Sequence, residues 1–232
     1  MGDPTRFVFD LETWLIAPGR LAPRLVCAAF KEDDQEVQIL HREDDWVPVF
    51  ERGLRAQEIV GHNIPFDLAV LIQAEPSLEP LIWKAYDEGR IKDTLIRAQL
   101  IAIALGRFKF DPTIGEKGAR PRWSLGDLVA RFVGEKVEGK TGPDVWRLRY
   151  HELDEVPLSQ WPAEALNYAK DDVQYTARLW DKLTRYAQSV GLTELPDEAN
   201  QNRAAWSLHL ASCWGIRTDK DAVDALETRL KA

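Results

Sequence analysis

The chain has 232 residues, of which 45% are hydrophobic, enough to bury one core and a small appendage. Its formal charge of −8 argues against a protein that binds duplex nucleic acid over a wide basic surface. Two separated cysteines in apolar surroundings, with no signal-like or membrane-spanning run, exclude secreted and membrane proteins and predict a cytoplasmic one.

The first part of the chain predicts a sheet. Apolar runs bounded by turn residues predict strands over 7–12, 25–31, 37–41 and 58–62, with a helix over 46–55. The polar residues 33–35 predict a hairpin between the second and third strands. Three consecutive strands, a helix and a returning strand are typical of an α/β fold with a mixed central sheet flanked by helices.

Asp10 and Glu12 end the first predicted strand. Residues two apart on a strand share a face, so both carboxylates leave the strand side by side while Leu11 points into the core. Two adjacent like charges repel, unless a divalent cation such as magnesium or manganese lies between them. The alternative is a strand edge with two solvated acids.

The segment 61–67 predicts a turn and the start of a helix, with Pro65 in the first turn. Asn63 and Asp67 are four residues apart and would share one face of that helix. Taken alone, Asn63 fits a helix N-cap as well as a ligand, and Asp67 could complement the helix dipole.

Further along, Asp93 and Ser124 predict helix N-caps, the latter with Asp127 in a weak capping box. A loop is predicted over 106–121, and basic residues gather in and beyond it, either as a solvated loop or as a guide for a nucleic-acid strand. These basic residues are Arg107, Lys109, Lys117, Arg120, Arg122, Lys136, Lys140, Arg147 and Arg149.

A long helix is predicted over 162–188. Tyr168 and Asp172 are four residues apart and face the same way, whereas Asp171 is turned away by about 100°. An acid on a largely apolar stripe needs a hydrogen-bond partner or a metal. The spacing alone leaves both open.

Together the segments F-D-L-E-T, H-N-x-x-F-D and Y-x-x-x-D, in this order, resemble the three motifs of the DEDD superfamily of 3′–5′ exonucleases. The tyrosine spacing resembles the DEDDy branch, because Asn167 stands where the DEDDh branch has histidine. The resemblance covers about residues 5–190 and implies a ribonuclease H-like exonuclease fold.

The resemblance also implies roles. Asp10, Glu12, Asp67 and Asp172 would bind two Mg²⁺ or Mn²⁺ ions, and Tyr168 would orient the attacking water. The substrate contacts would be Thr13, Asn63, Phe66 and one apolar residue that packs against the terminal base. Trp14, Leu15 and Ile16 are the candidates for this apolar contact, and Ile16 is the predicted one.

The end of the chain resembles something else. Residues 204–219 are similar to the segment that opens the polymerase part of family A DNA polymerases, and Val223, Leu226 and Leu230 share one face of a predicted helix. This predicts an exonuclease domain over 1–195 and the start of a truncated polymerase-like segment over 196–232.

The expected function is proofreading hydrolysis of single-stranded DNA 3′ ends, with the polymerase domain of the same longer chain as partner and no membrane. The alternatives are a ribonuclease D-like 3′–5′ exoribonuclease and a catalytically silent module that guides DNA to a polymerase.

Overall fold

The computed structural model describes residues 2–17, 22–114, 117–137, 145–192, 195, 197–215 and 219–231. The strands are β1 (Arg6–Thr13), β2 (Leu25–Glu32), β3 (Gln38–His41), β4 (Glu58–Gly61) and β5 (Ile91–Asp93). The α-helices are α1 (Val47–Gly53), α2 (Pro65–Ala74), α3 (Glu79–Asp87), α4 (Thr94–Ala104), α5 (Leu125–Leu128), α6 (Ala163–Ser189), α7 (Glu198–Trp214) and α8 (Lys220–Lys231). Short 3-10 or π segments are η1 (Pro76–Leu78), η2 (Val129–Val133), η3 (Trp146–Leu148), η4 (Tyr150–Leu153) and η5 (Leu158–Gln160).

The five strands form one mixed sheet in the order β3-β2-β1-β4-β5. β1 pairs antiparallel with β2 and parallel with β4, and β5 extends the parallel side. The predicted ribonuclease H-like fold, a mixed central sheet flanked by helices, is confirmed. The short β5 was not predicted.

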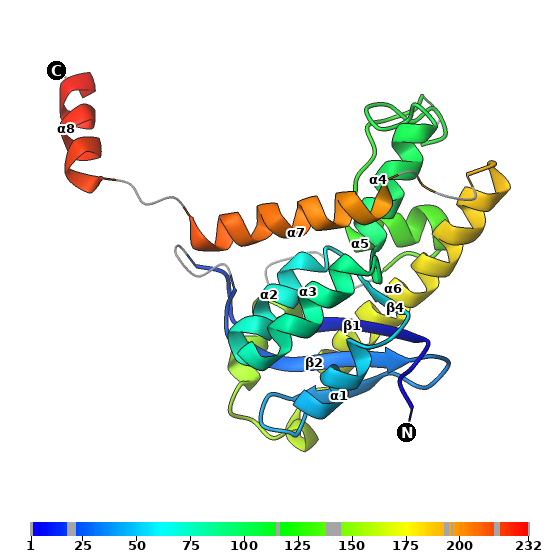
Figure 1. Cartoon of the computed structure of the whole chain (residues 1–232), viewed down its shortest axis with the longest axis horizontal. Helices are drawn as coiled ribbons and strands as arrows, with labels where there is room; N and C mark the ends of the chain where they lie inside the picture. The colour runs from blue at the N-terminus through cyan, green and yellow to red at the C-terminus, as the bar shows by residue number, and fades with distance from the viewer. Residues whose placement is uncertain are drawn as a thin grey trace.

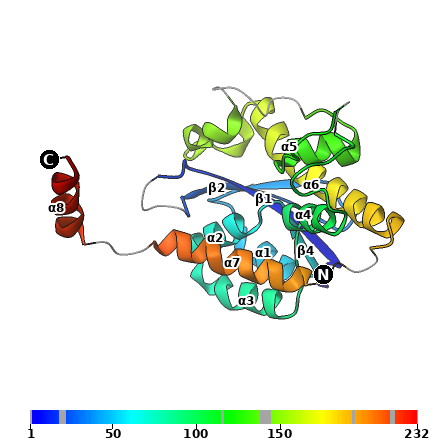
Figure 2. The ribbon, with the colours of Figure 1, turned by 90° about the horizontal axis from the view of Figure 1, so that it is seen from above.

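Helices cover both faces of the sheet (Figures 1 and 2). Phe7, Phe9 and Leu11 of β1 pack into the core shared with α1, α2, α3 and α7. Val8 points the other way, into the core shared with α6 and η4. The alternation along β1 thus decides which residues can meet α6.

The two predicted caps are confirmed. The Asp93 carboxylate accepts a hydrogen bond from the Leu95 N–H at 2.8 Å, and Ser124 Oγ accepts one from the Asp127 N–H at 3.2 Å. In the predicted loop, the described residues 106–114 and 117–121 form no helix or strand longer than an isolated bridge. Buried Asp111 accepts a hydrogen bond from Arg131 at 2.6 Å and ties this loop to η2.

α7 lies against the body of the chain. Trp206 is 1% exposed, and Glu198 forms an ion pair with Arg97 of α4 at 2.7 Å. The Asn202 amide donates to the Ile91 carbonyl oxygen of β5 at 3.2 Å. The predicted boundary between 195 and 196 therefore falls just before a helix that packs on α4 and β5.

α8 differs from α7 in this respect. The apolar residues that were predicted to share one face, Val223, Leu226 and Leu230, are all exposed, and no residue of α8 is buried. α8 stands apart from the sheet and its helices (Figure 1). Residues 216–218 of the polymerase-like segment lie outside the described residues.

Candidate active site

The end of β1 brings two acids and a backbone donor together. Asp10 and Glu12 are on the α6 side of the sheet, and Leu11 between them belongs to the opposite core. β4 pairs with β1 only as far as Val8, so the following edge of β1 meets α2 instead of a strand. There the Leu11 N–H donates to Asp67 Oδ1 at 3.0 Å, which fixes Asp67 at the first turn of α2.

α6 supplies the opposing wall. Ala169 and Val173 of α6 pack in the core on the sheet, so the adjacent face of this helix lies against the end of β1. Asp172 is buried on that face, and Tyr168 is half-buried one turn earlier. Asp171 is exposed, in agreement with the predicted rotation around the helix.

Three carboxylates converge between these elements. One oxygen each from Asp10, Glu12 and Asp172 lie within 4.8 Å of one another, with Glu12 and Asp172 buried. An all-oxygen donor set of this size suits a hard divalent cation such as Mg²⁺ or Mn²⁺. The residues therefore fit the implied metal, and we call them the carboxylate cluster.

Asp67 is next to the carboxylate cluster rather than in it. Burial, and then the charge of Asp10, raise the pKa of Asp67 well above its usual value. Burial, and then the charges of Asp172 and Glu12, likewise raise the pKa of the Tyr168 phenol, so this hydroxyl stays protonated at neutral pH. Burial is the larger cause of both pKa shifts, and the remaining part comes from neighbouring carboxylates whose charge a cation would offset.

Two residues behind the cluster, Tyr150 and Cys27, belong to no sequence motif. Tyr150 of η4 contacts the Tyr168 ring with centroids 6.1 Å apart and donates its hydroxyl to the Ala165 carbonyl oxygen at 2.7 Å. Cys27 faces Glu12 across the β1–β2 ladder and is fully buried. Burial, and then the charge of Glu12, raise the pKa of the Cys27 thiol. No spacing in the sequence connects either residue with a motif.

The predicted substrate residues lie at two places. Thr13 ends β1 and donates its hydroxyl to the Trp14 carbonyl oxygen at 2.8 Å, and Ile16 beyond it is 57% exposed. Phe66 is on α2, partly buried, with its ring 6.3 Å from His209 of α7. Ile16 is thus accessible to a ligand, whereas Phe66 also packs on α7.

Asn63 is not the N-cap of α2. It is exposed with a left-handed φ of 58°, and Ile64, not Asn63, is the N-cap of α2. The buried Asp93 carboxylate accepts the N–H groups of Asn63 and Ile64 at 3.0 and 3.1 Å, and burial raises the pKa of Asp93 to about 6. His62 Nδ1 is 2.8 Å from Thr94 Oγ1, and burial lowers the pKa of His62 to about 4. The turn that carries Asp67 is therefore tied to the start of α4.

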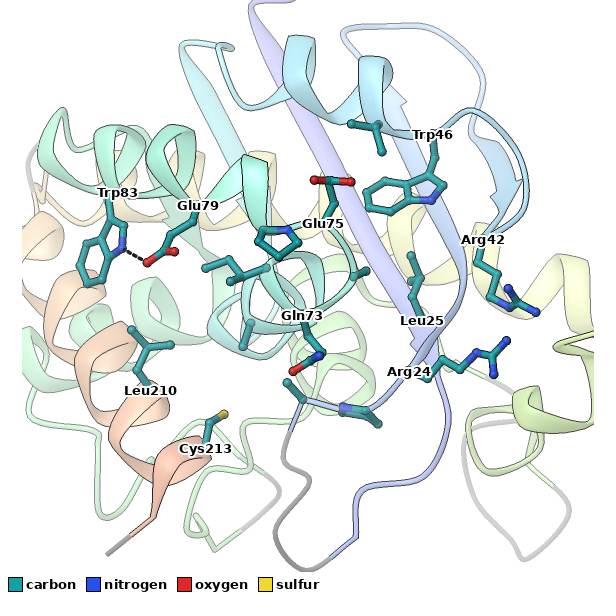
Figure 3. A pocket seen from close by; sticks show the side chains of 17 residues that line it. Arg24, Leu25, Arg42, Trp46, Gln73, Glu75, Glu79, Trp83, Leu210 and Cys213 are labelled. Atoms are coloured by element: carbon teal, nitrogen blue, oxygen red, sulfur yellow. Dashed lines mark hydrogen bonds between the residues drawn. The ribbon is translucent and has the colours of Figure 1, made fainter.

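A groove of about 1000 Å³ lies on the other face of the sheet, between the start of β2 and helices α1, α2, α3 and α7 (Figure 3). Trp46, Trp83, Leu210 and Cys213 are among its lining residues. None of the carboxylates of the cluster lines it. The groove is thus separate from the metal-binding geometry.

Comparison with protein families decides the broad class. A family model described as 3′–5′ exonuclease matches residues 3–188. The chain belongs to the 3′–5′ exonuclease family. It is a nuclease, and its carboxylate cluster can hold a divalent metal ion. The tyrosine-type subclass stays a prediction, and a comparison with curated proteins gives no match.

Solved structures share the fold of this exonuclease at low identity. Brucella melitensis NrnC bound to pGG is 18% identical with a TM-score of 0.62, over 94% of this chain and 89% of NrnC. A structure described as the apo form of the nuclease is 19% identical with a TM-score of 0.54, over 88% and 87%. A family B DNA polymerase from the hyperthermophilic archaeon Pyrobaculum calidifontis is 21% identical with a TM-score of 0.52, over 92% of this chain but 30% of the polymerase.

The predicted partner, a polymerase domain of the same longer chain, is wrong. The likeness to NrnC takes in 89% of the NrnC chain, which leaves no room there for a polymerase domain. Trp206, which belongs to the segment that resembles the start of a polymerase part, is instead buried in the core of this chain. The predicted proofreading role loses its support with this correction.

None of the described helices combines the length and the apolar character needed to cross a membrane. The absence of a membrane partner and the cytoplasmic location both stay predictions.

Proposed function

We propose that the chain is a metal-dependent 3′–5′ exoribonuclease that releases nucleoside 5′-monophosphates from short single-stranded RNA. The observation that carries the proposal is the carboxylate cluster of Asp10, Glu12 and Asp172 with Tyr168 one helical turn away. Each of these residues occupies the motif position that the exonuclease resemblance assigns to it.

The roles follow from the positions and charges of the side chains. Asp10, Glu12 and Asp172 would hold one divalent ion, and Asp67 would reach a second beside Asp10, directly or through water. Bound divalent ions lower the pKa of a water and stabilise the charge of the leaving oxygen. The raised pKa of Tyr168 makes it a hydrogen-bond donor that orients this water, not a base.

Thr13, Ile16, Asn63 and Phe66 would contact the 3′ end of the strand. A short strand needs few phosphate contacts, which agrees with the net charge of −8. RNA is favoured over DNA by the likeness to NrnC, which was solved with pGG bound. The family B polymerase is matched over only 30% of its length and supports the DNA alternative less.

The test is an exonuclease assay on a 5′-labelled single-stranded RNA a few nucleotides long and on the DNA of the same sequence. With Mg²⁺ or Mn²⁺ we expect stepwise shortening from the 3′ end of the RNA, and none with a chelator. Asp172→Asn removes one carboxylate of the cluster, so turnover should fall by about 10²-fold or more.

The matched control is Asp171→Asn. Asp171 is the neighbouring acid of α6, and it is exposed while Asp172 is buried, so this variant should keep the wild-type rate. Faster degradation of DNA than of RNA would favour the exodeoxyribonuclease alternative. An equal loss of turnover in both variants would show that the buried carboxylate of the cluster has no special role, and would contradict the proposed mechanism.

A further inference from the structure

We propose that Trp14 and His151 form a binding site for one nucleobase of the bound strand, beside the carboxylate cluster. We call the pair the aromatic platform. The proposal rests on the proposed function, because it requires a single strand to enter this face of the sheet.

Both residues of the aromatic platform are close in the chain to a residue of the candidate active site or to one that contacts it. Trp14 follows β1 directly and is two residues beyond Glu12. His151 belongs to η4, and the preceding Tyr150 contacts Tyr168 with ring centroids 6.1 Å apart. η4 also packs in the core on the α6 side of the sheet. A strand whose 3′ end reached the cluster would therefore pass near the platform.

The Trp14 ring is accessible to a ligand, and His151 is half-buried beside it. The centroids of Trp14 and His151 are 5.8 Å apart with an angle of 53° between the ring planes, and Trp14 is 39% exposed. Every nucleobase has an apolar face that stacks on aromatic side chains, and proteins that bind single strands use such surfaces without reading sequence. The exposed indole matches this chemistry.

The indole is also held in place. Its Nε1–H donates to Asp154 Oδ2 at 3.1 Å, and Asp154 is 3% exposed. The same carboxylate accepts from Arg42 and lies 3.3 Å from the Arg24 Nε. A side chain fixed before binding loses less conformational entropy when the ligand arrives. Asp154 is thus a positioning residue for Trp14.

The platform is distinct from the predicted contact to the terminal base. Ile16 is two residues further along and aliphatic, and its side chain offers no ring face. The Trp14 N–H donates to the Arg24 carbonyl oxygen at 2.9 Å, which fixes the backbone at the platform. Contacts at Trp14 and at Ile16 would serve two different nucleotides.

The experiment compares Trp14→Ala with Trp83→Ala in steady-state kinetics on short single-stranded RNA. Trp83 is a matched control, because it is also 39% exposed and its Nε1–H also donates to a carboxylate, Glu79, at 3.1 Å (Figure 3). It lines the groove on the other face of the sheet. We expect Trp14→Ala to raise KM by roughly 5- to 150-fold, the range of base–aromatic stacking, with a much smaller change in kcat. Trp83→Ala should keep the wild-type KM.

A second arm separates stacking from a structural role. The substrates carry one abasic nucleotide at a time, and the one that lacks the base stacked on Trp14 should bind the wild type more weakly. At that position Trp14→Ala should cause no further loss, whereas at other positions both losses should add. Trp14→Phe, which keeps a ring, should give an intermediate KM and guards against a folding defect in the alanine variant.

The outcomes are distinguishable. Suppose that the wild type degrades RNA. An unchanged KM for Trp14→Ala, or equal losses at every abasic position, would then overturn the aromatic platform and leave the proposed function standing. Wild-type chain that degrades no single strand would overturn the proposed function and the platform with it.

Discussion

Trp206→Ala tests whether α7 belongs to the exonuclease fold. Trp206 is 1% exposed, its ring stacks on Tyr86 with centroids 5.4 Å apart, and it meets the ring of Trp83 at 5.8 Å. A buried tryptophan removes about 150–250 Å² from water. At about 25 cal/mol per Å² this is about 4–6 kcal/mol, an upper estimate. We therefore expect the free energy of unfolding to fall by about 3–5 kcal/mol.

The assay is urea unfolding followed by circular dichroism, with the slope of the transition compared between variants. Trp206→Phe is the control, since it keeps an aromatic ring and removes an indole N–H that has no hydrogen-bond partner among the described residues. Its cost should be about 1 kcal/mol. A loss below about 1 kcal/mol for Trp206→Ala would show that α7 is an appendage and refute the packing argument.

Three further predictions concern the site and its supports. Tyr168→Phe should keep metal affinity, measured by calorimetry, and lower kcat by about 10²-fold, because it removes one hydroxyl and no carboxylate. Arg131→Met leaves the buried Asp111 carboxylate without its arginine, so thermal unfolding should show a loss of about 3–5 kcal/mol, and unchanged stability would contradict this. The low folded pKa of His62, about 4, should reduce stability by up to about 3 kcal/mol as pH falls from 6.5 to 4. The raised pKa of Asp93, about 6, should reduce stability by a similar amount as pH rises from 4 to 6. In a pH series of urea midpoints, His62→Gln and Asp93→Asn should therefore change the slope of the wild-type profile in opposite directions.

Local periodicity was enough to predict which side chains of each element share a face. The two-residue repeat of a strand places Asp10 beside Glu12, and the helical repeat places Tyr168 and Asp172 on one face. Both rules act within one element, so no knowledge of packing was needed. That the two elements meet came from the order of the motifs, that is from the family resemblance.

Contacts between distant segments could not be predicted in the same way. Asp154 binds Trp14 across 140 positions, and no motif includes it. The three residues of β5 are too few for a periodic pattern. The wrong partner prediction came from the similarity of residues 204–219 to the start of a polymerase part. A short sequence similarity does not say which surface buries a residue such as Trp206, which packs in the core of this chain.

The position of Cys27 has a consequence for chemical labelling. The thiolate is the reactive form of cysteine, and both burial and the acids in front of Cys27 keep its thiol protonated. Cys213 is only partly buried and lines the groove next to α7. A maleimide dye should therefore attach at Cys213 and leave Cys27 unmodified. α7 could then carry a fluorescent reporter without a label next to the carboxylate cluster.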